Sequence, residues 1–137
     1  MKLRHLLALA AALSIGLASV TLADPVLAGH SGFAGQSLDA DGVKSVLLGK
    51  KTTVGNIRTV IIIAKDSPAQ EQFIKEHLAM TSSQFQNHWR RLFMTGGGSA
   101  PKVVENAADL AKLLATVPGA IGITDHAAAG ELTILAK

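Results

Sequence analysis

One strand constrains the fold more than any other feature of this sequence: residues 57–64, which contain the run VIII. The run is β-branched and continuously apolar rather than alternating, so we expect both faces of this strand to be buried, as in a parallel sheet. Directly after it come a capping serine, Ser67, a proline suited to the first helical position, Pro68, and Gln70 at the third position. These residues form a capping-box pattern and predict a helix over residues 68–79. A strand followed by a helix indicates a βα unit.

The remaining elements are predicted from N-cap residues and from apolar spacing. Asp39, Thr81 and Asn106 each precede apolar residues at helical spacing, and Gln84 completes a capping box with Thr81. The other predicted elements are strands at residues 25–28, 120–124 and 132–135, a loop at residues 96–101, and helices that end at Gly49 and at Pro118. The resulting order βαβαααββ predicts an α/β fold of three layers, a mostly parallel sheet with helices on both faces.

The amino-terminal segment has the pattern of a secretory signal peptide. Lys2 and Arg4 precede an uncharged apolar run, and small residues stand at the positions that a signal peptidase reads before Ala23. We therefore expect residues 1–23 to be removed and residues 24–137 to form a single domain. Cleavage after Ala28 is the alternative. With the leader removed we expect no membrane span and a periplasmic location.

Composition excludes several classes of function. Two of the 13 basic residues belong to the predicted leader, so the rest nearly balance the 10 acidic residues and give no basic surface for nucleic acid. The sequence has no cysteine, which excludes disulfides, thiolate metal sites and a lipid-modified cysteine anchor. No cofactor is predicted.

Motifs spread over residues 25–135 resemble a known group, the short single-domain relatives of the phosphate ABC transporter substrate-binding protein in the type II periplasmic binding protein superfamily. The resemblance rests on five segments in order. They are Leu38-Asp39; Val46 to Thr52; Asp66-Ser67 followed by Phe73; Trp89 with Arg91, Phe93 and Gly96; and Pro118 to Gly122. It implies a fold like one lobe of such a protein.

The resemblance also implies a function, a periplasmic solute-binding-protein-like domain that binds phosphate or another small oxyanion weakly, with an ABC permease as a partner. The chain departs from the full-length relatives, however. It has Ser67-Pro68-Ala69 where they have a Ser-Gly-Thr helix start, and Ile63 where they have an arginine. Proline also removes an amide donor. The alternative is an interaction or regulatory module of the cell envelope that kept the fold and lost ligand capture.

Two places are candidate anion sites. Ser67 and Ala69 lie at a predicted helix start, where free amides and the helix dipole attract an anion, although Ser67 also fits a simple helix cap. Gly97, Gly98 and Ser99 can form a backbone nest or, alternatively, a plain loop between helices.

Other residue types give weaker indications. The four histidines after the leader, His30, His77, His88 and His126, fall in different predicted elements, so we expect no metal site. Trp89 has the spacing of a core residue, which leaves Arg90 and Arg91 in solvent or paired with Glu76 or Glu105. No nucleophile-elbow pattern or close carboxylate pair indicates catalysis, so no catalytic residue is predicted and we expect no enzymatic activity.

Overall fold

The structure, a computed structural model, describes residues 24–96 and 101–137. The predicted leader, with its cleavage site after Ala23, lies outside the described residues, as do Gly97, Gly98 and Ser99. Within the two described ranges, no helix combines the length and the apolar character needed to cross a membrane.

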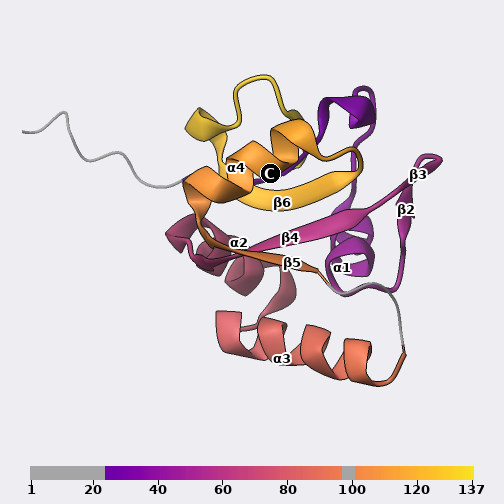
Figure 1. Ribbon diagram of the computed structural model, residues 1–137, viewed down its shortest axis with the longest axis vertical. Coiled ribbons are helices and arrows are strands. Elements are labelled where there is room, and N and C mark those ends of the chain that lie inside the picture. The colour runs from indigo at the N-terminus through magenta and orange to yellow at the C-terminus, as the bar shows by residue number, and fades with distance from the viewer. Residues whose placement is uncertain (1–23, 97–100) are drawn as a thin grey trace, which may run out of the picture.

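The described chain alternates strands and helices in an order close to the predicted one (Figure 1). The strands are β1 (Pro25–Gly29), β2 (Thr53–Val54), β3 (Ile57–Arg58), β4 (Val60–Asp66), β5 (Lys102–Asn106), β6 (Ala120–Asp125) and β7 (Thr133–Ala136). The α-helices are α1 (Ala40–Leu47), α2 (Pro68–Leu78), α3 (Ser82–Met94) and α4 (Ala107–Thr116), and two short 3-10 helices cover Ser31–Phe33 and His126–Ala128.

Five strands form the central sheet in the order β5-β4-β6-β1-β7. The pairs β4–β5 and β4–β6 are parallel, while β1 runs antiparallel to both of its neighbours, β6 and β7. Because β1 alone is reversed, the other four strands share one direction. This arrangement confirms the predicted α/β fold with a mostly parallel sheet.

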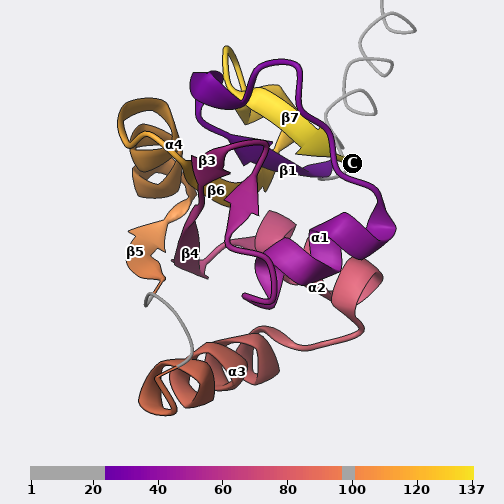
Figure 2. The ribbon, with the colours of Figure 1, turned by 90° about the vertical axis from the view of Figure 1, so that its right-hand side faces the viewer.

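Helices cover both faces of the sheet, and a separate apolar cluster lies under each set of helices (Figure 2). On one face, Leu110 and Leu114 of α4 share a cluster with Ile62. On the other face, Ile61 and Ile63 belong to the larger cluster, which also contains residues of α1, α2 and α3. The apolar run of β4 is therefore buried on both sides, as its lack of alternation predicts.

The structure corrects the predicted element boundaries in two places. The strand predicted from residue 57 is interrupted, because Ile57 and Arg58 pair with β2 in a hairpin that turns at Gly55, and β4 begins only at Val60. In addition, β5 lies between the predicted third and fourth helices. Only two of its five residues are apolar and Val103 is 53% exposed, so its sequence carries little of the signal of a buried strand.

The caps explain why the helices start where they do. Asp39 and Asn106 accept hydrogen bonds from amides three residues on, and Thr81 forms the predicted capping box with Gln84. Helix α3 is attached to the end of α1 by side-chain bonds to its last carbonyls. The Trp89 indole donates to the Leu47 carbonyl at 3.0 Å, and His88 Nε2 lies 2.8 Å from the Leu48 carbonyl.

Candidate functional site

The start of α2 lies at the carboxyl end of β4, where α/β proteins commonly bind ligands. Helix α2 follows β4 onto one face of the sheet, whereas α4 follows the neighbouring strand β5 onto the other face (Figure 1). Two adjacent parallel strands whose helices leave to opposite faces form a topological switch point, and the crevice outside it is the usual ligand position. This topology sets Ser67 and Ala69 at that edge.

Ser67 is the N-cap of α2. Its hydroxyl oxygen accepts a hydrogen bond from the Gln70 amide at 3.2 Å, and its carbonyl accepts from the Glu71 amide at 3.1 Å. Pro68 occupies the first helical position and has no N–H to offer. Among the described residues, the Ala69 amide and the Ser67 hydroxyl proton are the first-turn donors without an acceptor. Both residues are largely buried, at 4% exposed for Ser67 and 8% for Ala69.

Gln70 has a role that the sequence did not indicate. The capping-box pattern predicts that its side chain returns to the Ser67 amide, and this detail is wrong. Instead, Gln70 is 2% exposed, its Oε1 accepts from the Ala64 amide, and its Nε2 donates to the Ala64 carbonyl, both at 2.9 Å. The pairing of β4 with β6 covers only Val60 and Ile61 of β4. Further along β4, at Ala64, the side-chain amide of Gln70 takes the place of a neighbouring strand.

Acidic residues stand next to the start of α2 in the chain and on the neighbouring strand. Asp66 precedes Ser67 and Glu71 lies in the first turn of the helix, while Glu105 stands on the adjacent strand. The nearest cation in the sequence, Lys65, forms an ion pair with Glu105 at 3.0 Å. A bound anion therefore gains little from Lys65, and it meets repulsion from the neighbouring carboxylates.

All three residues of the second candidate site lie outside the described residues, and only the residues that flank it can be placed. The Thr95 hydroxyl is engaged with the Arg91 and Leu92 carbonyls at the end of α3, at 3.0 and 3.1 Å. Lys102 is exposed on β5. The nest proposed for Gly97, Gly98 and Ser99 stays a prediction.

The histidines have separate structural surroundings. His30 accepts from the Gly32 amide at 3.0 Å, and the His77 ring stacks on Phe73 with the ring centres 4.0 Å apart. His88 contacts the end of α1, and His126 is exposed in a short helix. Within residues 24–96 and 101–137, no group of three or more His, Cys, Asp or Glu side chains is arranged to hold a metal ion.

Trp89 is a core residue, as its spacing predicts, with 6% of its surface exposed. The suggested pairing of Arg90 or Arg91 with a glutamate is not found among the described residues. Glu105 pairs with Lys65 instead, and an Arg90 nitrogen lies 3.5 Å from the Asn87 side-chain oxygen.

Comparison with known proteins shows a fold relationship and nothing closer. No protein-family model and no curated protein matches this chain. A solved structure that does match is a phosphate ABC transporter substrate-binding protein from Clostridium perfringens with bound phosphate. The two are 12% identical with a TM-score of 0.62, over 82% of this chain and 44% of the other. The chain thus spans less than half the length of that protein, and its fold is consistent with one lobe of a periplasmic binding protein.

Proposed function

We propose that this chain is a solute-binding-protein-like domain that captures a small oxyanion, such as phosphate, weakly at the start of α2. The observation that supports this most is the position of Ser67, at a helix N-terminus and at the switch point of a fold shared with a phosphate-bound protein. Helix N-termini favour anions through free amides and the helix dipole. The Ser67 hydroxyl and the Ala69 amide are the two donors we assign to the anion.

Weak capture follows from the local chemistry. Pro68 removes one amide, the Ser67 oxygen already takes the Gln70 amide, and the nearby carboxylates oppose an anion. The fold matches one lobe, so its ligand is enclosed less completely than a ligand held between two lobes. A less enclosed ligand binds more weakly. If the domain serves ABC transport, an ABC permease is its partner.

Export by a cleaved leader, and hence a periplasmic location, is part of the same proposal. We place cleavage after Ala23 rather than Ala28. Cleavage after Ala28 would remove most of β1, whose residues are buried and lie between β6 and β7 in the sheet. The domain would then lack a buried strand of its central sheet.

Calorimetric titration of the purified protein with phosphate and with sulfate tests oxyanion capture. A hydrogen bond to a charged group is worth about 1.5–3 kcal/mol, so Ser67→Ala is expected to weaken binding by roughly tenfold or more. Thr81→Ala is the matched control, because it removes the corresponding N-cap hydroxyl from α3. Equal binding by the wild-type protein and Ser67→Ala, or no saturable heat from either anion, would contradict the proposal.

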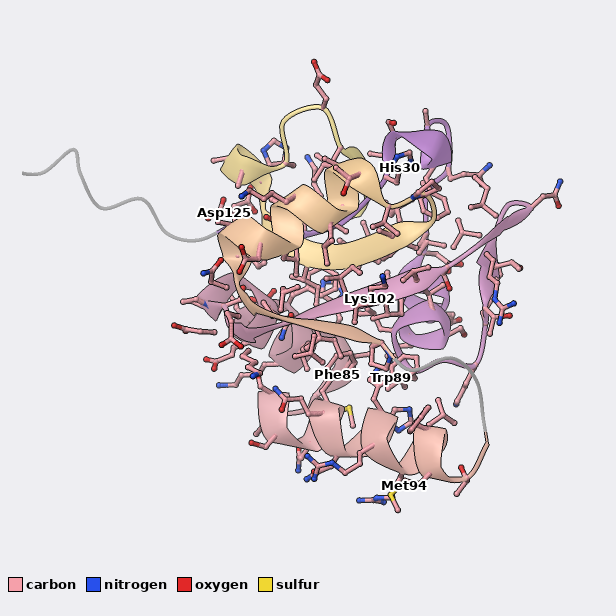
Figure 3. The ribbon with its side chains drawn as sticks, viewed as in Figure 1. His30, Phe85, Trp89, Met94, Lys102 and Asp125 are labelled. Carbon is pink, nitrogen blue, oxygen red and sulfur yellow. The ribbon has the colours of Figure 1, made fainter. Side chains whose placement is uncertain are left out.

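A second candidate function, docking onto another protein of the envelope, is favoured by one observation. Three large apolar side chains, Phe93, Met94 and Val103, are 59%, 78% and 53% exposed, and they come from the end of α3 and from β5. Phe93 and Val103 line one groove, whereas Met94 lies on the side of α3 away from the sheet (Figure 3). Exposed apolar side chains that share a groove are typical of an interaction surface.

A further inference from the structure

The outer edge of β5 is an open sheet edge. β5 is the terminal strand and pairs with β4 alone, so along its other side its backbone N–H and C=O groups have no partner among the described residues. Four of its five residues are exposed. An open edge is a template for an extended backbone, which adds as one more strand through main-chain hydrogen bonds.

An apolar groove lies beside this edge, between α3 and β5. Its volume is about 220 Å³, and it is lined by Ile63, Gln86, Trp89, Arg90, Phe93, Pro101 and Val103. Figure 3 shows Phe85 and Trp89 on the side of α3 that faces the sheet. Val103 is in register with Ile63, a residue of the cluster on the α3 side of the sheet, so its side chain points to the same side as the groove. An added strand would therefore place alternate side chains over this groove.

The charges around the groove indicate which strand fits. Arg90 lines the groove, whereas Lys102 is in register with Ile62 and so points to the opposite side of the sheet, where α4 lies; neither cation has a carboxylate partner among the described residues. Glu105, the acidic residue of β5, is paired with Lys65. A carboxylate on the groove side of an incoming segment would thus meet the unpaired cation Arg90.

We propose that the β5 edge and its groove bind an extended, acidic segment of another protein, with an apolar side chain in the groove and a carboxylate beside Arg90. A second copy of this chain fits less well. It would bring the same cations, Arg90 and Lys102, and a glutamate that is already paired. This inference rests on the docking function and not on oxyanion capture.

A direct test uses two labelled synthetic peptides, each ten residues long and blocked at both ends. One has the repeat Val-Thr-Glu-Thr and the other has the repeat Val-Thr-Lys-Thr, so that the valines and the charged residues lie on the same face of an added strand. Fluorescence anisotropy is expected to show saturable binding of the Glu peptide and several-fold weaker binding of the Lys peptide. Replacing two of the valines by proline, which cannot donate to a strand, is expected to abolish binding.

Charge reversal on α3 supplies the matched variants. Arg90→Glu is expected to weaken binding of the Glu peptide several-fold and to strengthen binding of the Lys peptide. Arg91→Glu makes the same change one residue on, outside the groove lining, and is expected to leave both affinities unchanged. Phe93→Asp places a charge in the groove and is expected to prevent binding of the Glu peptide.

Several results would overturn the proposal: no saturable binding of the Glu peptide, equal effects of Arg90→Glu and Arg91→Glu, or amide shifts in NMR spectra that avoid β5. A dimer in analytical ultracentrifugation that Phe93→Asp dissociates would show that the edge takes a second copy instead. Ser67→Ala is expected to leave peptide binding unchanged, so failure of this proposal and failure of oxyanion capture are distinguishable.

Discussion

Gln70 forms two hydrogen bonds with the backbone of one residue, Ala64. The side-chain oxygen accepts from the Ala64 amide and the side-chain nitrogen donates to the Ala64 carbonyl, each at 2.9 Å and away from solvent. A side-chain amide thus does at this point what a neighbouring strand does elsewhere along β4. The first turn of α2 is tied to the strand that precedes it.

Replacing Gln70 by leucine is expected to destabilise the domain. The change leaves a buried N–H and a buried C=O of Ala64 without partners, and each unsatisfied group costs about 1–3 kcal/mol. Urea denaturation followed by circular dichroism measures the loss. Gln72→Leu, at an exposed position of the same helix, is the control and is expected to change stability by less than about 0.5 kcal/mol. Similar losses in both variants would contradict the role given to Gln70.

Trp89→Phe is expected to lower the free energy of unfolding by about 1 kcal/mol through the lost hydrogen bond, with a further loss from the smaller ring. The indole N–H no longer reaches the Leu47 carbonyl at the end of α1. Circular dichroism during thermal unfolding provides the readout, because the variant has no tryptophan fluorescence. An unchanged unfolding curve would show that this bond does not hold α3 in place.

Gly49 and Gly96 provide a matched pair of glycines. Both adopt a left-handed conformation, with φ of 78° and 77°, which costs a residue with a side chain roughly 1–2 kcal/mol. A Cβ at Gly49 would lie 2.7 Å from Leu92 and 2.9 Å from Trp89, whereas one at Gly96 meets no described residue within 4 Å. We expect Gly49→Ala to be clearly more destabilising than Gly96→Ala in urea denaturation. Equal losses of stability in the two variants would mean that the contact between α1 and α3 rearranges without an energetic cost.

Pro68→Ala is expected to strengthen oxyanion binding. The change restores an amide donor at the first helical position of α2 and adds no charge. Titration with phosphate measures the gain, and Pro118→Ala, an exposed proline before β6, is the control. Unchanged affinity in Pro68→Ala would indicate that the anion does not bind at this helix start.

The sequence predicted the parts of the fold that depend on local chemistry. The cap at Ser67, the capping box at Thr81 and the apolar run of β4 each follow from neighbouring residues, and all are confirmed. They give the βα unit and therefore the edge at which the candidate site lies.

What the sequence did not predict depends on residues far apart in the chain. β5 is a strand because β4 lies beside it, and its own exposed residues carry little strand signal. The bond from Gln70 to Ala64 depends on where the pairing of β4 with β6 ends, which no local pattern reports. The groove beside Arg90 likewise exists only once α3 is placed against the sheet.

The position of β1 between β6 and β7 has a consequence for the order of events in folding. Val26 is in register with Thr124, and Leu27 with Ala136, so the first strand to be synthesised finds both of its neighbours among the last. Contacts between such distant segments form late, because a long loop must close first. The sheet therefore closes only after β6 and β7 have been made.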